Sequence, residues 1–381
     1  MYKMEVLVRY GEIFLKSEPV RRIYEKILIK NIKRALKREG IEFSLRRERG
    51  RIFIEGNEEK IVEALKNVFG IVSFSPCYHL ETCDIEKIKE FVKSNYEKWI
   101  KPDQTFAIRA KRVGNHEYTS KDLEREVGKV VDRKVNLDNP DVTIFIEVRW
   151  NDTYIYTQII KGLGGLPVGS SGKVLSLLSG GIDSPVASFL AMKRGCKVSF
   201  VHFHSHPLVS NRSIEKSKEI VKILNKYQFR SVLYLVPFHE IQMKIKATVI
   251  PKYRIILYRR FMLRIAEKIA KRENAKALVT GESLAQVSSQ TLDNIATIEE
   301  VTKMPILRPL IGMDKEEIIQ IAKKIGTYNI SILPQEDCCT LFIPKHPATK
   351  SDVKTIKEIE KKLDVKEMVN KALKETEKVI I

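Results

Sequence analysis

The hexapeptide S-G-G-I-D-S at residues 179–184 constrains the fold of this 381-residue chain more than any other segment. It directly follows the apolar run 174–178, which is typical of a buried strand, and Pro185 stands where a first helical turn would begin. Two glycines let the backbone approach a bound phosphate closely, and amide groups at a helix N-terminus favour an anion. The segment therefore predicts a phosphate-binding turn between a strand and a helix.

Strand-like and helical patterns alternate after residue 172. Strands are expected at 173–178, 197–203, 231–237 and 277–280, and helices from 185, at 213–226 and at 253–271. Such alternation is the signature of an α/β fold with a doubly wound parallel sheet and helices on both faces. The preceding segment 162–172, GLGGLPVGSSG, is rich in glycine and serine and predicts a joint between domains.

The residues before this joint predict two small α+β units. A strand at 4–10, a helix at 19–38, strands around 43 and 51–55 and a helix at 58–68 suit a ferredoxin-like unit. Helices at 84–100 and 120–134 with strands at 105–111, 142–148 and 154–160 suggest the second unit. We therefore expect three domains, at 1–75, 76–165 and 166–381.

The charge balance indicates a polyanionic partner, because 68 Lys and Arg against 48 Asp and Glu leave a formal net charge of +20. The excess of positive charge is strongest on the helix predicted at 19–38. A solvent-exposed helix face in a heat-stable protein rich in ion pairs is the alternative explanation for these charges. The candidate RNA-binding residues are Arg21, Arg22, Lys30, Arg34, Lys111 and Arg112.

Other sequence features exclude classes of protein. No apolar run approaches the roughly 18 residues of a membrane span, and charged Glu5 and Arg9 fall where a signal peptide would be apolar. Five cysteines at these spacings fit neither a disulfide framework nor a paired zinc motif. We expect a cytoplasmic protein with no membrane partner.

Adjacent Cys338 and Cys339 lie in a polar segment between Pro334 and Pro344. Neighbouring cations lower a thiol pKa and neighbouring acids raise it, and both flank this pair, so the thiolate fraction stays open. At this level, buried apolar cysteines and cysteines with redox or sulfur chemistry are equal alternatives.

The S-G-G-I-D-S string resembles the signature of PP-loop ATP pyrophosphatases, which cleave ATP between the α and β phosphates. Four stretches together are similar to the tRNA 4-thiouridine synthetase family of tRNA sulfurtransferases and cover nearly the whole chain. They are YGEIFLK at 10–16, a THUMP-like segment from about 77 to 165 that contains GLGGLP, S-G-G-I-D-S, and TGESLAQVSSQT at 280–291 with DCCT at 337–340. The resemblance implies a PP-loop domain after ferredoxin-like and THUMP RNA-binding domains.

The resemblance also implies the site. It assigns ATP binding to Leu177, Leu178, Ser179, Gly180, Gly181, Ser184, His202, Phe203, Arg259, Gly281 and Gln290. It implies catalytic roles for Asp183, for Lys315, which would neutralise charge developing on the phosphate, and for Cys338, which would handle sulfur. His202, His204 and His206 alternate along a strand end, but we expect no zinc there, since the family pattern needs none.

The implied reaction uses ATP and Mg²⁺ to adenylate O4 of the uridine at tRNA position 8, after which sulfur displaces AMP and gives 4-thiouridine. The sequence continues for only 42 residues after Cys339, which is too short for the rhodanese domain that many relatives carry. We therefore expect a separate sulfur donor: a cysteine desulfurase, a rhodanese-like protein or sulfide. A homodimer, in which one subunit binds RNA and the other modifies it, stays open.

Two other readings compete with this one. A PP-loop enzyme acting on another tRNA acceptor, or using ammonia instead of sulfur, would keep the adenylation chemistry. An RNA-binding module with a vestigial ATP site would release no pyrophosphate.

Overall fold

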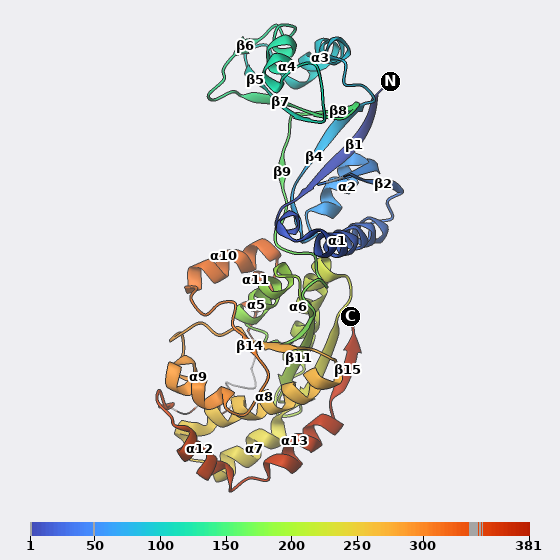
Figure 1. Ribbon diagram of the computed structural model, residues 1–381. Helices are drawn as coiled ribbons and strands as arrows, with labels where there is room; N and C mark the ends of the chain where they lie inside the picture. The colour runs from blue at the N-terminus through green and yellow to red at the C-terminus, as the bar shows by residue number, and fades with distance from the viewer. Residues whose placement is uncertain (1, 49, 335–341, 343, 345) are drawn as a thin grey trace. The chain divides into compact units, whose positions relative to one another are not determined.

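The computed structural model describes residues 2–48, 50–334, 342, 344 and 346–381, and the chain forms two compact units that meet in sequence at Gly165 and Leu166. Figure 1 shows both units. Among the described residues, no helix combines the length and the apolar character that crossing a membrane requires.

The described residues of the first unit form one nine-stranded sheet with helices packed on it (Figure 1). The strand order is β2-β3-β1-β4-β8-β7-β5-β6, and β9 pairs with β4. The strands are β1 (Tyr2–Tyr10), β2 (Phe43–Glu48), β3 (Arg51–Gly56), β4 (Ile71–Leu80), β5 (Thr105–Val113), β6 (Lys134–Val135), β7 (Val142–Arg149), β8 (Asp152–Tyr156) and β9 (Ile160–Lys161). The helices are η1 (Glu12–Leu15), α1 (Glu18–Arg38), α2 (Glu58–Leu65), α3 (Ile85–Trp99) and α4 (Ser120–Gly128).

Strand β4 runs through the division predicted between residues 75 and 76. It pairs with β1 along its length and, through Tyr78 to Leu80, with β8. The two predicted domains therefore share one continuous sheet.

A buried histidine connects the strands of this sheet. His79 of β4 lies between Glu5 of β1 (Nδ1 to Oε1, 3.5 Å) and Asp152 of β8 (Nε2 to Oδ1, 2.7 Å), and its side chain is 7% exposed. Burial alone would lower the pKa of His79, but the two carboxylates outweigh burial and raise it. The pKa of Glu5 is correspondingly lowered, because His79 and Arg46 outweigh the effect of burial. This charge network connects β1, in the first predicted unit, with β8 in the second.

The described residues of the second unit form a six-stranded sheet of order β14-β13-β10-β11-β12-β15, parallel except for β15. The strands are β10 (Lys173–Leu177), β11 (Lys197–His204), β12 (Val232–Pro237), β13 (Ala277–Val279), β14 (Ile306–Leu307) and β15 (Glu377–Ile380). The helices are α5 (Asp183–Lys193), α6 (Arg212–Gln228), α7 (His239–Thr248), η2 (Pro251–Tyr253), α8 (Arg254–Arg272), η3 (Ser288–Gln290), α9 (Leu292–Glu299), α10 (Lys315–Ile325), α11 (Tyr328–Ser331), α12 (Val353–Glu360) and α13 (Val365–Lys374). The predicted doubly wound α/β fold is confirmed.

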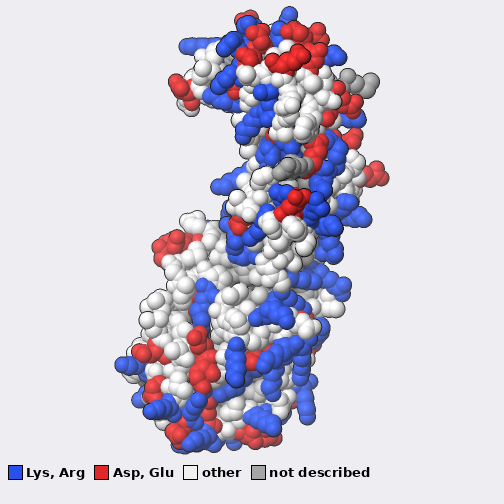
Figure 2. Space-filling view, viewed as in Figure 1, with Lys and Arg blue, Asp and Glu red and all other residues white. Residues whose placement is uncertain are grey.

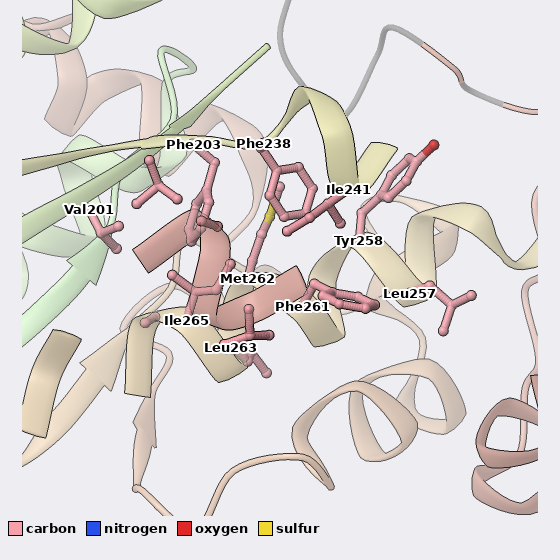
Figure 3. Packing of buried hydrophobic residues seen from close by; sticks show 14 of the residues in the cluster. Val201, Phe203, Phe238, Ile241, Leu257, Tyr258, Phe261, Met262, Leu263 and Ile265 are labelled. Atoms are coloured by element: carbon pink, nitrogen blue, oxygen red, sulfur yellow. The ribbon is translucent and has the colours of Figure 1, made fainter. Parts of the chain in front are cut away.

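Helices cover both faces of this sheet. Helix α8 packs with α7, α9 and α13, whereas α5 packs with α6 and α10 (Figure 1). Figure 3 shows the core on the α8 face, where Phe203 of β11 and Phe238 meet edge to face with ring centroids 5.4 Å apart. The buried face of α8 is apolar, because apolar residues such as Phe261 and Ile265 recur along it at helical spacing.

The C-terminal tail ends in a strand. After α12 and α13, residues Glu377–Ile380 form β15, which pairs antiparallel with β12. Backbone pairing with an available sheet edge decides the conformation here, and local sequence does not reveal that edge.

Candidate functional site

The S-G-G-I-D-S loop joins β10 to α5 and is closed by its two serines. The Ser184 hydroxyl accepts a hydrogen bond from the Ser179 amide at 2.9 Å and donates to the Ser179 carbonyl at 3.1 Å. The loop therefore ends at the N-terminus of α5, where helix amide groups and the helix dipole favour an anion.

Gly281 lets a second chain segment approach this helix end. A Cβ atom at residue 281 would lie 2.7 Å from the Ser184 nitrogen and 2.9 Å from the Asp183 carbonyl carbon, closer than real side chains come. Residue 281 follows β13, and β13 and β11 pair with opposite sides of β10. The loops after β10 and β13 consequently meet at the switch point of the sheet, where α/β proteins bind ligands.

Asp183 begins α5 and pairs with Lys315, the first residue of α10. Their Nζ and Oδ1 atoms are 2.6 Å apart, and Gln286 donates to the other carboxylate oxygen at 3.1 Å. A capping box formed by Asp314 and Glu317 fixes the start of α10 and so positions Lys315. Both catalytic residues predicted within the described part of the chain are thus in contact.

A pocket opens at this edge of the sheet. Among the predicted ATP residues and Asp183, its lining includes Leu177, Leu178, Ser179, Asp183, Ser184, His202, Phe203, Arg259, Gly281 and Gln290. Gly180 and Gly181 belong to the same loop but not to the lining, and Lys315 reaches the pocket through Asp183. Cys338 and Cys339 lie outside the described residues.

The pocket has an apolar part and a charged part. Met262, Leu263, Ile298 and Ile306 line the apolar part. They suit the flat, largely apolar face of a purine base, whereas the Ser179–Ser184 loop suits phosphates.

Three charged side chains in the pocket were only partly foreseen. Arg259 was predicted to bind ATP. Glu282 and Arg308, which line the same pocket, were not assigned a role. Glu282 accepts from Arg259 at 2.5 Å and from Arg308 at 2.7 Å. Burial would lower the pKa of Arg308, but Glu282 and Glu299 outweigh burial and raise it. The signal for Glu282 was its place just after the strand predicted at 277–280.

The histidines at the end of β11 have separate surroundings. His202 is buried and its Nδ1 lies 2.9 Å from the Leu178 carbonyl oxygen. The pKa of His204 is lowered to about 4, mainly by burial and to a smaller extent by the neighbouring imidazoles of His202, His206 and His239. Across the described ranges, no three His, Cys, Asp or Glu side chains are arranged to hold a metal ion.

The candidate RNA-binding residues lie in the first unit. Arg21, Arg22, Lys30 and Arg34 are on α1, and Lys111 and Arg112 are on β5. Figure 2 shows Lys and Arg side chains gathered over α1. Arg22 is partly neutralised by Glu18, 2.6 Å away, whereas Lys30 and Arg34 are exposed.

Comparison with known proteins places these features in one class. The family model described as "Thiamine biosynthesis protein (ThiI)" matches residues 169–365, the "ThiI ferredoxin-like domain" matches 5–75, and the "THUMP domain" matches 83–158. The fold and the pocket thus define a PP-loop protein with ferredoxin-like and THUMP domains.

Full-length relatives narrow the class. A "Probable tRNA sulfurtransferase" of Geobacillus kaustophilus is 45% identical over 99% of this chain and 95% of its own, and one of Brevibacillus brevis is 43% identical over 98% and 95%. The crystal structure of a 4-thiouridine synthetase–RNA complex with bound ATP is 36% identical, with a TM-score of 0.90 and full coverage of both chains. PH1313 from Pyrococcus horikoshii is 27% identical, with a TM-score of 0.67 over 85% of this chain and 99% of that chain. The chain belongs to the tRNA sulfurtransferase (ThiI) family, which confirms the resemblance seen in the sequence.

Proposed function

We propose that this protein is a tRNA uracil 4-sulfurtransferase that converts the uridine at tRNA position 8 to 4-thiouridine with ATP. The observation that carries the proposal is the pocket at the N-terminus of α5, where ten residues assigned from the sequence to ATP or catalysis converge. The solved relative described as an RNA complex with bound ATP supports both ligands.

The first step follows from the phosphate end of the pocket. The uridine O4 attacks the α-phosphorus of ATP as the N3 proton of the uracil is released, the bond from this phosphorus to the oxygen that bridges the α and β phosphates breaks, and pyrophosphate leaves. Amide groups of the loop at 179–184 and the ammonium group of Lys315 face the charge that develops on the phosphate oxygens. Lys315 is held by Asp183, so its charge is already in place before the reaction begins.

Asp183 fits a magnesium ion that arrives with the nucleotide. Mg²⁺ in nucleotide sites takes one or two carboxylates together with phosphate oxygens, and Asp183 supplies a carboxylate beside the loop. Bound there, Mg²⁺ would neutralise phosphate charge. Lys315 and Gln286 contact the carboxylate oxygens, so coordination requires one of these contacts to yield.

The second step replaces oxygen by sulfur. A sulfide or persulfide sulfur attacks C4, and the C4–O4 bond breaks so that AMP departs with the original O4. With sulfide the product is 4-thiouridine directly; with a persulfide, a second thiol must break the remaining S–S bond and become part of a disulfide. Cys338 is the proposed sulfur-handling residue, and the donor's identity, the homodimer and the cytoplasmic location stay predictions.

The test combines two products in one assay. Purified protein is incubated with an unmodified tRNA transcript, ATP, Mg²⁺ and sulfide, and 4-thiouridine and pyrophosphate are measured. The matched control is the same transcript with cytidine at position 8. We expect equal amounts of both products with uridine and neither with cytidine. Thiolation at another position would refute the assigned site, and ammonia-dependent formation of a 4-amino product would refute the sulfur chemistry.

A further inference from the structure

Glu282 joins two arginines that come from different elements around the pocket. Arg259 lies in the first turns of α8, Arg308 follows β14, and Glu282 follows β13. Glu282 Oε1 accepts from Arg259 Nη1 at 2.5 Å, and Oε2 accepts from Arg308 Nε at 2.7 Å. All three side chains line the pocket.

The carboxylate is held on several sides. Glu282 is 6% exposed, and the Thr280 hydroxyl donates to Oε2 at 3.0 Å. A carboxylate buried to this degree needs charged partners, and two guanidinium groups supply them. Arg308 is fixed at a further point, because its Nη2 donates to Glu299 at 2.7 Å. These contacts fix the Glu282 carboxylate and the Arg308 guanidinium group relative to each other.

The negative charge of Glu282 would by itself repel the phosphates of a nucleotide. Glu282 can favour nucleotide binding only through the two arginines that it holds. Glu282 directly follows Gly281. Because Gly281 closely approaches Asp183 and Ser184, Glu282 lies beside the phosphate loop. An ionised carboxylate can only accept hydrogen bonds, so it cannot bind a phosphate itself. Glu282 and Glu299 balance the charges of Arg259 and Arg308, so the cluster offers directed N–H donors to a ligand and no net positive charge.

Both arginines keep donors for a ligand. Arg259 uses Nη1 for Glu282, and Arg308 uses Nε and Nη2 for its two carboxylates. A guanidinium has five N–H donors in a fixed plane, so each group retains donors after these bonds. Holding that plane fixes the direction of the remaining donors.

We propose that Glu282 is a positioning residue that holds Arg259 and Arg308 as a pair of phosphate-binding groups, and that Arg308 is a second arginine contacting the ATP phosphates. The inference rests on the proposed function in one respect, namely that ATP is the ligand. It assigns roles to two residues, Glu282 and Arg308, through which the pocket selects a polyphosphate.

The test separates position from charge with two variants. Glu282→Asp keeps the charge but shortens the arm, and Glu282→Gln keeps the length but removes the charge. The affinity for a non-hydrolysable ATP analogue is measured without tRNA, and kcat and KM for pyrophosphate formation are measured with tRNA. We expect both variants to weaken analogue binding at least about ten-fold, as loss of a charge-assisted hydrogen bond would. The value of kcat/KM for ATP should fall by at least the same factor.

Two results would overturn the proposal. If Glu282 only tunes charge, Glu282→Asp behaves as the parent protein and Glu282→Gln binds the analogue more tightly. If Glu282 only supports the fold, both variants melt at lower temperature but bind the analogue normally while folded.

Glu360 provides a matched control, because it also joins two arginines, Arg260 and Arg264, but does not line the pocket. Glu360→Gln, measured well below its melting temperature, should keep the parent analogue affinity. If the Glu282 variants do not fold, Arg308→Lys answers the question, since it keeps the charge and loses the planar fork; unchanged analogue binding would exclude Arg308 as a phosphate ligand. A parent protein that binds the analogue but releases no pyrophosphate with tRNA would refute the proposed function while leaving the binding test valid.

Discussion

Replacing Lys315 with alanine should separate a catalytic contact from a stabilising one. Its ammonium nitrogen is 2.6 Å from Asp183 Oδ1, and the two side chains are 43% and 22% exposed. Ion pairs with this much solvent access stabilise a fold by about 0–1 kcal/mol. The free energy of unfolding should therefore fall by less than about 1 kcal/mol.

The expected effect on the reaction is much larger. A preorganised donor to charge that appears only in the transition state contributes about 10²–10³-fold in kcat, or roughly 3–4 kcal/mol. The assay is single-turnover release of pyrophosphate at saturating ATP and tRNA, beside urea denaturation of the same preparation. A loss of rate near 10²-fold with almost unchanged stability is the predicted combination.

Lys361 is the matched control. It pairs with Glu358 at the same 2.6 Å, also in the second unit, and it does not line the pocket. Lys361→Ala should leave pyrophosphate release at the parent rate. If Lys315→Ala keeps more than about a third of the parent rate of pyrophosphate release, Lys315 does not stabilise the charge that develops on the phosphate oxygens.

Four further outcomes are expected. Glu360→Ala removes one of the two carboxylates that pair with the fully buried Arg260, while Glu300 keeps its contact at 3.1 Å, and the free energy of unfolding in urea should fall by about 1–3 kcal/mol. The raised pKa of His79 means that its contribution to stability is complete below pH about 6.5 and is lost as pH rises through the folded-state pKa. His79→Gln should therefore flatten, above that pH, the pH dependence of the opening free energy of β4, measured by hydrogen exchange and corrected for the intrinsic exchange rate. Arg34→Ala should lower the slope of log K against log salt for tRNA binding by about 0.9. Cys338→Ser should still release pyrophosphate but form no 4-thiouridine from a persulfide donor.

Each outcome has a result that would contradict it. A Glu360→Ala protein as stable as the parent would show that solvent or another group compensates Arg260. Unaltered exchange profiles after His79→Gln would remove the histidine from the pH response. An unchanged salt slope would take Arg34 out of the tRNA interface, and normal thiolation by Cys338→Ser would reassign the sulfur-handling residue.

The phosphate loop was predictable because its determinants are local. A short apolar strand, paired glycines and a proline at the start of the helix suffice to specify the turn, and the structure places Ser179 and Ser184 accordingly. The alternation after residue 172 likewise fixes the fold class, because parallel strands need helical crossovers between them.

Longer-range features were beyond the sequence. Glu282 and Arg308 are 26 positions apart, and only the pairing of β13 with β14 brings them together. Strand β15 forms because the edge of β12 is available to it, a circumstance that local propensity does not report. The sheet of the first unit is continuous because β4 pairs with β1 on both sides of the division predicted at residue 75. Local sequence does not report how far this pairing extends.

The position of oxygen after the reaction tests the central claim most directly. A tRNA transcript carrying ¹⁸O at O4 of uridine 8 is thiolated with ATP and sulfide, and the AMP released is analysed by mass spectrometry. If O4 is adenylated and leaves with the nucleotide, AMP carries one ¹⁸O for each 4-thiouridine formed. Formation of 4-thiouridine with unlabelled AMP would contradict the adenylation mechanism.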